Sequence, residues 1–254
     1  MGSRITNLAE LAGSGLLSGA AALQRTMPLL AAFDELLPQA AVQRGSIVEC
    51  DGAAAVSLAL ALAAGPSQAG AWVGVAGLTE VSVAAAVELG LAPERLVMVA
   101  EPAQRFDDAQ WADVLAAMID GFDVLLLGPG VHGVRAGTAR RLSARLQQRG
   151  AVMFTVAGVG GAPGPFGADL RFVATDTAWQ GLGEGHGVAR GRRVSVQLDG
   201  RRVPRARRAE LWLPTADGAV EAVSFTVAPL PVPLPAPLSV PLSVPLSVPL
   251  SATG

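Results

Sequence analysis

Short apolar runs alternate with helix-length segments through the middle of the chain, and this alternation is what most constrains the fold. The runs at 46–50, 71–77, 95–100, 122–127 and 151–156 have the length and the Val and Leu content of strands that are buried on both faces of a sheet. Strands that alternate with helices predict a parallel sheet with crossover helices, which is an α/β domain.

Two of the intervening segments carry helix signals at their ends. The segment 107–120 begins with the acids Asp107 and Asp108 and ends before Gly121. Its apolar residues share one face, as expected of an amphipathic helix: Trp111, Val114, Leu115 and Met118. A second helix is expected to end at Gly150, in the same way.

The pattern changes after residue 165. Residues 192–198 alternate between apolar and polar side chains, which predicts a half-exposed strand, and Asp199 and Gly200 predict a two-residue hairpin turn. A second alternating run covers 208–213. We therefore expect antiparallel strands to extend the parallel sheet at its C-terminal edge.

The two ends of the chain differ from this core. Residues 1–40 are expected to form lead-in helices, one of them near 29–37, and residues 41–228 the α/β core. In residues 229–254 the motif PLSV repeats, and proline at every fourth position forbids a helix and removes sheet donors. This tail either docks on a partner through its Leu and Val side chains or is a repeat without a role, and the sequence leaves both open.

Composition excludes several classes of protein. A net charge of −2 argues against a protein that coats nucleic acid by bulk electrostatics, and the single cysteine, Cys50, rules out an intrachain disulfide and suits a reducing cytoplasm. The N-terminus has no signal-peptide pattern. The longest apolar stretch, 53–64, is far shorter than the roughly 20 residues of a membrane span. We expect a cytoplasmic protein with no membrane contact.

Residues 46–62 have the layout of a nucleotide-binding P-loop, namely a buried strand, a tight glycine turn and an apolar helix. The P-loop requires a second glycine followed by lysine and a hydroxyl residue, which close around the phosphates and hold magnesium. None of the 254 residues is lysine, and no glycine follows Gly52 until Gly65. Ser57 is the only hydroxyl nearby, and a bond to the preceding helical turn explains it. Asp51, Gly52 and Ser57 therefore form a degenerate P-loop.

The magnesium-binding acid of a P-loop ATPase is absent as well. The strand at 122–127 runs into Gly128 and Pro129, and its acid, Asp123, lies at the opposite end, roughly 16 Å away at about 3.3 Å per residue. Arg44 or Arg135 could replace the lysine, but nothing replaces the acid. We therefore expect no hydrolysis, no catalytic residue and no cofactor.

Arginines are concentrated near the C-terminal strands. Eight of the 19 lie between residues 190 and 208, against one acid, Asp199. The group fits a DNA backbone, an acidic partner surface or a solvated hairpin edge, and these three interpretations stay open. Its members are Arg190, Arg192, Arg193, Arg201, Arg202, Arg205, Arg207 and Arg208.

A smaller basic feature lies on the helix that ends at Gly150. Arg141, Arg145 and Arg149 are spaced by four residues and share one face, which is either solvated or a partner surface. His132 and His186 are the only histidines, and no spacing suits a metal site.

Several segments together resemble a known family. They are QRGSIVECDGAAAVSLALALAAGPS, AGAWVGVAGL, ADVLAAMIDGFDVLLLGPG, GTARRLSARLQQRGAV, AWQGLGEGHGVARGRRVSV and RRAELWLP. Over about residues 28–216 the chain resembles the actinobacterial ImuA-type proteins, which are RecA-like accessory factors of the SOS mutasome. The resemblance implies a RecA-like core without a working nucleotide site. It also implies partners in translesion synthesis, namely an ImuB-like inactive polymerase homologue and an error-prone replicative-type polymerase.

Two functions of different classes follow. The first is a non-catalytic RecA-like adaptor in SOS-induced mutagenesis and DNA repair, which binds mutasome polymerases and also a RecA-type recombinase, a second copy of itself or, weakly, DNA. The second is a divergent ATP-binding RecA-family ATPase or nucleotide-gated switch acting on DNA, which retains nucleotide through backbone N–H groups near Gly52.

Overall fold

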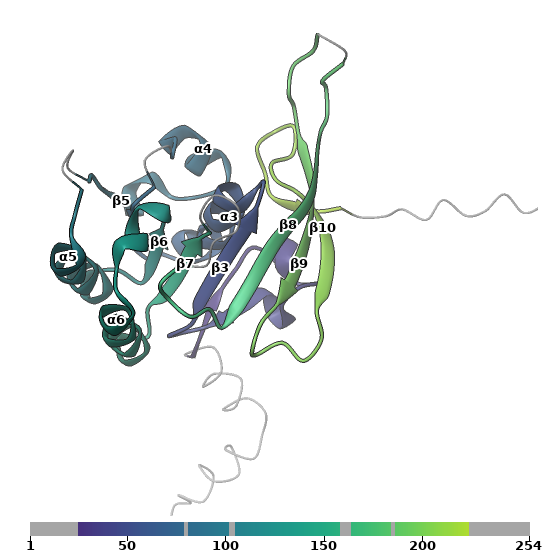
Figure 1. Ribbon diagram of the computed structural model, residues 1–254. Coiled ribbons are helices and arrows are strands. Elements are labelled where there is room, and N and C mark those ends of the chain that lie inside the picture. Colours follow the sequence, from purple (N-terminus) through teal and green to yellow (C-terminus); the bar gives the residue numbers. More distant parts are fainter. Residues whose placement is uncertain (1–24, 79–80, 102–104, 158–163, 184–185, 224–254) are drawn as a thin grey trace, which may run out of the picture. The chain divides into compact units, whose positions relative to one another are not determined.

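A sheet of nine strands runs through the part of the chain that the computed structural model describes, which is residues 25–78, 81–101, 105–157, 164–183 and 186–223 (Figure 1). The strand order is β11-β10-β9-β8-β3-β7-β6-β4-β5. The pairings from β8 through β3 to β5 are parallel, and those that join β8, β9, β10 and β11 are antiparallel. The expected mixed α/β architecture, with a mostly parallel sheet and an antiparallel C-terminal extension, is confirmed.

The strands lie close to the ranges that the sequence predicts. The parallel part contains β3 (Ile47–Gly52), β4 (Val73–Ala76), β5 (Leu96–Val99), β6 (Val124–Leu127) and β7 (Val152–Val156). The antiparallel extension contains β8 (Leu170–Trp179), β9 (Arg192–Asp199), β10 (Arg207–Trp212) and β11 (Glu221–Ala222). The long strand β8, which joins the two parts, is missing from the sequence-based prediction.

Helices cover both faces of the parallel part. They are α3 (Ala55–Gln68), α4 (Val83–Glu88), α5 (Asp108–Gly121) and α6 (Ala136–Arg149), with short 3-10 turns η3 (Pro93–Arg95) and η4 (Pro129–Gly133). Helix α3 packs in one hydrophobic cluster with the N-terminal segment, and α5 and α6 pack in a second cluster on the opposite face. The expected amphipathic face of α5 is confirmed, because Trp111, Leu115 and Met118 are buried in that second cluster.

Alternation along β3 assigns its side chains to the two faces. Val48 and Cys50 belong to the cluster of α3, whereas Ile47 belongs to the cluster of α5 and α6. Glu49 and Asp51 share the face of Ile47, because successive strand side chains point to opposite faces. Two carboxylates therefore lie on one side of a central strand, at its carboxyl end.

The N-terminal segment corrects one prediction. In place of an α-helix near 29–37, the chain forms a short hairpin of β1 (Thr26–Pro28) and β2 (Ala41–Gln43), with the 3-10 turns η1 (Ala31–Phe33) and η2 (Pro38–Ala40) between the strands. The N–H of Leu29 bonds to the carbonyl of Ala40 at 2.6 Å across the hairpin, and most backbone bonds between residues 30 and 37 join residues three apart, as in a 3-10 turn. Buried Phe33 packs edge-on against Phe172 of β8, with ring centroids 6.3 Å apart.

The connection between β9 and β10 differs from the predicted hairpin turn. Arg207 pairs with Leu198, so residues 200–206 form a longer loop in place of the two-residue turn predicted at Asp199 and Gly200. The chain turns within this loop, where the N–H of Val203 bonds to the carbonyl of Gly200 at 3.1 Å. Pro204 cannot donate to a ladder, and the loop therefore stands outside the strand pairing.

Several predicted features lie outside the described residues. They are the lead-in segment 1–24 and the PLSV repeats within 224–254. Within the described part of the chain, no helix combines the length and the apolar content that a membrane crossing requires.

Candidate functional site

At the glycine turn that ends β3, a carboxylate of the protein accepts a backbone hydrogen bond. The carboxylate of Asp51 accepts a hydrogen bond of 2.7 Å from the backbone N–H of Gly52, which is the type of donor that a P-loop offers to a phosphate. Gly52 has a φ of +90°, and a Cβ placed there would lie 2.2 Å from the carbonyl oxygen of Ala174 on β8. The glycine is therefore required by the approach of β8.

An arginine from β8 pairs with two acids beside this turn. Arg171 lies directly opposite Glu49 in the parallel register, and its Nε is 3.1 Å from a Glu49 carboxylate oxygen. Its Nη2 pairs with Asp51. Glu49 is buried, with 8% of its side chain exposed. The arginine thus binds carboxylates of its own chain at the position where a nucleotide site would present cations to phosphate.

The first turn of α3 completes the degenerate P-loop. The residue before the helix is Ala54, so no side chain caps the first helical N–H groups. Ser57 lies half-buried on the first turns of the helix. Among the described residues its hydroxyl has no recorded partner, so the expected bond to the preceding turn stays a prediction. These N–H groups are the feature that favours a retained nucleotide site.

The carboxyl edge of the sheet carries one acid that sequence reasoning missed. Asp123 lies at the opposite end of β6, as predicted, where it accepts a bond from the N–H of Trp72 at 3.1 Å. Glu101 follows β5, and a Cβ on Gly130 would lie 3.2 Å from its carboxylate. Because β5 is four strands from β3, roughly 19 Å at about 4.8 Å per strand, Glu101 is too far from Gly52 to share a metal with it.

The eight arginines do not form one patch. Arg192 and Arg193 lie at the start of β9, whereas Arg201 and Arg202 lie beyond its other end, roughly 20 Å away along the strand. Arg192 donates to the carbonyl of Leu213 at 3.1 Å and stacks over a tryptophan ring, and burial lowers its pKa. The two pairs of arginines are close in the sequence, but the extended strand β9 between them keeps them apart in space.

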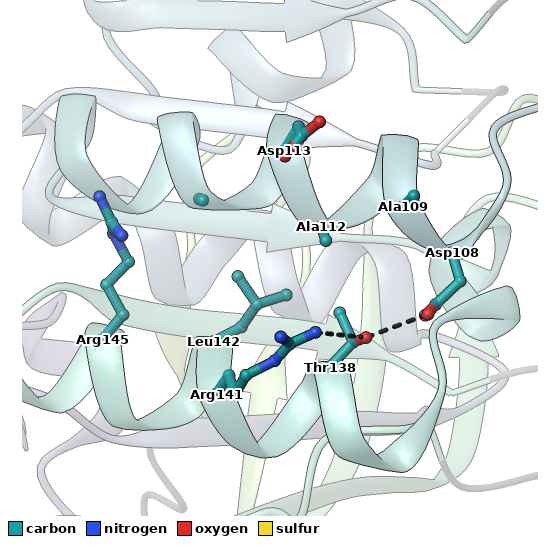
Figure 2. Close-up of a pocket in the computed structure, with 9 residues that line it drawn as sticks. Asp108, Ala109, Ala112, Asp113, Thr138, Arg141, Leu142 and Arg145 are labelled. Carbon is teal, nitrogen blue, oxygen red and sulfur yellow. Dashed lines mark hydrogen bonds between the residues drawn. The ribbon is translucent and has the colours of Figure 1, made fainter.

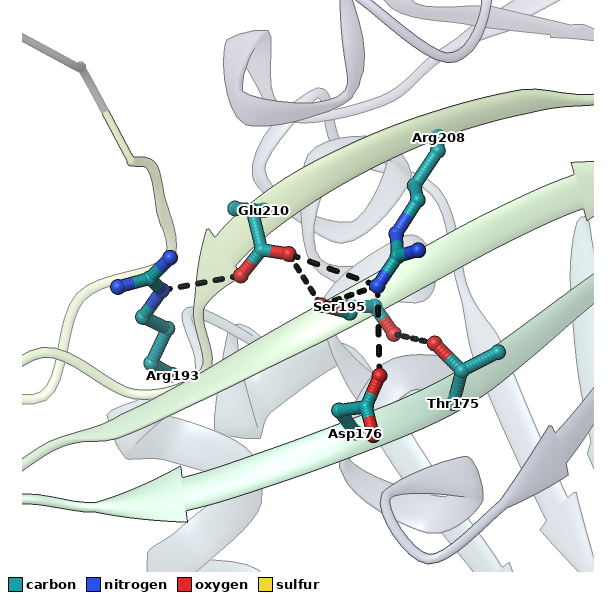
Figure 3. A network of polar contacts seen from close by, with 6 residues as sticks. All are labelled: Thr175, Asp176, Arg193, Ser195, Arg208 and Glu210. Carbon is teal, nitrogen blue, oxygen red and sulfur yellow. Dashed lines mark hydrogen bonds and ion pairs between the residues drawn. The ribbon is translucent and has the colours of Figure 1, made fainter.

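Strands β8 and β10 supply carboxylates to two of these arginines, Arg193 and Arg208 (Figure 3). Glu210 accepts from Nε of Arg193 at 2.9 Å and from the hydroxyl of Ser195, and Arg208 reaches Asp176 at 3.3 Å. Partial burial acts to raise the pKa of Glu210, but the bonds from Ser195 and Arg193 outweigh it and lower that pKa. This part of the arginine group is a polar network on the face of the extension.

Other arginines of the group differ in whether they contact an acid of the protein. Arg201 lies 3.2 Å and Arg202 3.5 Å from the same carboxylate oxygen of Asp169. Among the described residues, no ion pair or side-chain hydrogen bond is recorded for Arg190 or Arg205. These two are therefore the members of the group whose guanidinium no described residue pairs with.

The arginine face of α6 is directed largely at α5. Both Nε and Nη2 of Arg145 bond to the carboxylate of Asp120, with Nε at 2.8 Å, and Arg149 reaches the Asp120 carbonyl at 3.3 Å. Arg141 bonds to the Thr138 hydroxyl at 3.3 Å. The bonds from Arg145 lower the pKa of Asp120. The predicted partner face is thus in large part a contact between helices.

The same two helices are joined at their N-terminal ends. Asp108 accepts from the N–H of Arg135 at 2.7 Å and from the Thr138 hydroxyl at 3.1 Å, and these bonds lower its pKa. Between the two attachments lies a cavity of about 440 Å³, with Ala109 and Ala112 on α5 and Leu142 on α6 (Figure 2). The helices therefore present a shallow groove with fixed walls.

The structure also bears on Cys50 and on metal binding. Cys50 is fully buried, as expected, and burial, followed by the charges of Glu49 and Asp51, raises the pKa of its thiol. Within the described ranges, no group of three or more His, Cys, Asp or Glu side chains has the arrangement of a metal site.

Comparison with known proteins assigns the chain to a family. The fold defines a mixed α/β protein with a mostly parallel sheet, whose central strand β3 ends in a glycine turn. A family model described as the MT3502 N-terminal domain matches residues 35–161, which is half of the chain, and the chain belongs to this family. The match spans β2 to β7 and ends before the antiparallel extension.

A curated relative comes from Mycobacterium tuberculosis. The uncharacterized protein Rv3395c is 31% identical to this chain over 102 residues, which is 40% of this chain and 48% of that protein. The matched region thus spans about half the length of this relative.

Proposed function

We propose that the protein is a non-catalytic RecA-like accessory protein in SOS-induced translesion mutagenesis and DNA repair. In this role it acts in the cytoplasm and binds the polymerase components of a mutasome. The observation that carries the non-catalytic part is the bond between the Asp51 carboxylate and the Gly52 N–H, in a turn that also lacks lysine. A phosphate entering this turn meets a negative charge where a nucleotide site offers a cation.

The sheet supports the RecA-like part of the proposal. The strand that precedes the degenerate P-loop lies inside the parallel sheet, between β7 and β8, and the helices that follow the strands cover both faces. Antiparallel strands extend the sheet beyond β8. This mixed α/β arrangement supports the RecA-like core that the resemblance to the ImuA-type proteins implies.

The partners in the proposal rest on that resemblance, which covers about residues 28–216. They are an ImuB-like inactive polymerase homologue and an error-prone replicative-type polymerase. The mycobacterial origin of the relative agrees with the actinobacterial distribution of the ImuA-type proteins. A protein that has lost phosphate chemistry but keeps a large rigid sheet is suited to hold other proteins in place.

Capture from cells tests this role. The tagged full-length chain is used as bait in lysates of DNA-damaged and undamaged cells of the source organism, and the two polymerase components are quantified by mass spectrometry. The proposal predicts that both are enriched after damage, and a bait lacking residues 229–254 shows whether the tail contributes. Failure of the full-length bait to enrich either polymerase component would remove the mutasome assignment.

A divergent nucleotide-binding switch is the second candidate, and the uncapped start of α3 favours it. Free N–H groups at a helix N-terminus attract anions. In this alternative a nucleotide displaces Asp51 from the Gly52 N–H, and binding then alters affinity for DNA. Calorimetry with Mg-ATP separates the two candidates, since only the switch predicts saturable binding.

A further inference from the structure

A cavity lies between the N-terminal hairpin and the loop that joins β9 to β10. Its volume is about 310 Å³, and its walls are mainly apolar, with Leu36, Leu37, Val42, Leu170 and Val203 among them. This is the lower end of the roughly 300–1,000 Å³ that ligand sites occupy. We call it the loop cavity. It has room for one or two bulky apolar groups.

Two arginines contribute to the lining of the loop cavity. Arg202 bonds through Nη1 to the side chain of Gln43 and to the hydroxyl of buried Ser46 at 3.4 Å. Arg207 bonds through Nη1 to the carbonyl of Leu36 at 3.4 Å. One nitrogen of each guanidinium is thus tied to the wall of the cavity, which fixes where the remaining N–H groups lie.

The charge around the loop cavity is not balanced. A guanidinium carries five N–H donors, and in the described part of the chain no partner is recorded for Nη2 of Arg202 or for Nε and Nη2 of Arg207. Asp169 is the carboxylate recorded in contact with Arg202, at 3.5 Å, and it also binds Arg201 and the N–H of Ile47. None of the described residues that line the cavity is an acid. The cavity therefore joins an apolar interior to cationic donors that no described protein group occupies.

We propose that the loop cavity binds a short peptide segment of a partner protein, in which an acidic residue adjoins a bulky apolar one. The apolar side chain enters the cavity, and the carboxylate is held by Arg202 and Arg207. Such a combination of a buried anchor and a polar rim is typical of the residues that dominate protein interfaces. The inference rests on the proposed accessory role only in taking the occupant to be a protein segment.

Fluorescence anisotropy with the purified full chain tests the site. The probes are labelled eight-residue peptides that contain Asp-Asp-Leu-Phe at their centre, with one set in which Asp is replaced by Asn and one in which Leu and Phe are replaced by Ala. We expect saturable binding of the parent peptide and at least about tenfold weaker binding of both altered sets, since 1.4 kcal/mol is tenfold in affinity.

Two variants and a control locate the binding. R207Q removes a guanidinium that makes one recorded side-chain hydrogen bond, and A41F fills the cavity from β2. R205Q is the matched control, because Arg205 lies on the same loop and does not line the cavity. Circular dichroism checks that each variant is folded. We expect R207Q and A41F to weaken binding at least about tenfold and R205Q to leave it unchanged.

The outcomes separate this inference from the accessory role. No binding of the parent peptide, or equal binding by R207Q and the original chain, would overturn the site. If polymerase components are captured from cells while the peptide does not bind, the accessory role stands and this site is wrong. If the peptide binds and R207Q abolishes the binding while no polymerase is captured, the site stands and the mutasome role is wrong.

Discussion

Asp51 and Arg171 lie on adjacent parallel strands and form an ion pair beside the glycine turn that ends β3. The pair links residues 120 positions apart in the chain. Through Asp51 it also reaches the N–H of Gly52. The glycine turn after β3 is therefore held in shape by charges of the protein itself.

The variant D51N tests how much this pair stabilises the fold. It removes a partly buried charge, with 15% of the Asp51 side chain exposed, while an amide oxygen can still accept from Gly52. We expect a loss of about 1–2 kcal/mol in the free energy of unfolding, measured by urea denaturation. D113N is the control on an exposed carboxylate of α5 and should change stability by less than about 0.5 kcal/mol. Equal stabilities of D51N and the original chain would show that the pair is not stabilising.

Replacing Gly52 tests the close approach of β8. In G52A the new Cβ would lie 2.2 Å from the carbonyl of Ala174, at a φ that disfavours side chains. We expect a loss of more than about 2 kcal/mol, because both strain and a clash must be relieved. In G137A, on α6, no atom lies within 4 Å of the new Cβ, and stability should change little or rise by up to about 1 kcal/mol. Similar effects of the two substitutions would contradict this account of the turn.

Acid should weaken the link between α5 and α6. The hydrogen bonds from Arg135 and Thr138 lower the pKa of Asp108, and Arg145 lowers that of Asp120. A carboxyl group whose pKa is lower in the folded state than in the unfolded state stabilises the fold above its ordinary pKa of about 3.9, and that contribution is lost as the pH falls from this value through the lower pKa of the folded state. Thermal unfolding between neutral and acidic pH should therefore show a smaller decline for D108N than for the original chain. Parallel declines would mean that Asp108 does not titrate differently in the two states.

The thiol of Cys50 should be unreactive in the folded protein. It is fully buried, and burial, followed by the nearby carboxylates, raises its pKa, so the reactive thiolate is scarce at mildly alkaline pH. We expect a thiol reagent to label the chain only at the rate of unfolding and to label it fully in denaturant. Rapid stoichiometric labelling under native conditions would contradict the buried position.

DNA binding, if it occurs, should depend on the arginines without internal partners. The double variant R190A/R205A removes donors for which no partner is recorded among the described residues, whereas R208A breaks contacts with Asp176 and Ser195. A DNA interface on this surface predicts that R190A/R205A lowers affinity and reduces its salt dependence, measured by electrophoretic mobility shift. R208A should lower thermal stability. An affinity unchanged in R190A/R205A would remove these two residues from any DNA interface.

The strands of the parallel sheet could be predicted because each is buried on both faces and reads as an apolar run. Strand β8 could not be predicted in this way. Its first half, near Leu170 and Phe172, is buried, but residues from Thr175 to Trp179 are exposed and polar side chains interrupt the pattern. The segment at 29–37 misled for a different reason, since its Leu and Phe residues are buried by the sheet and not along a helix face.

The candidate site shows what a linear sequence omits. Missing lysine and glycine residues could be recognised directly, and they predict the degenerate turn. The partner of Asp51 could not, because Arg171 becomes its neighbour only when β8 pairs with β3. Likewise, the arginines near residue 200 are close in sequence, but the acids that bind them, Asp169 and Asp176, arrive from another strand or loop.

Titration of Mg-ATP into the purified full-length chain by isothermal calorimetry, with phosphate release followed in parallel, tests the central claim most directly. The turn at Gly52 already holds the Asp51 carboxylate, and no lysine is present to compensate. The account predicts no saturable heat up to millimolar nucleotide and no phosphate release. Saturable binding in the low micromolar range accompanied by turnover would contradict it.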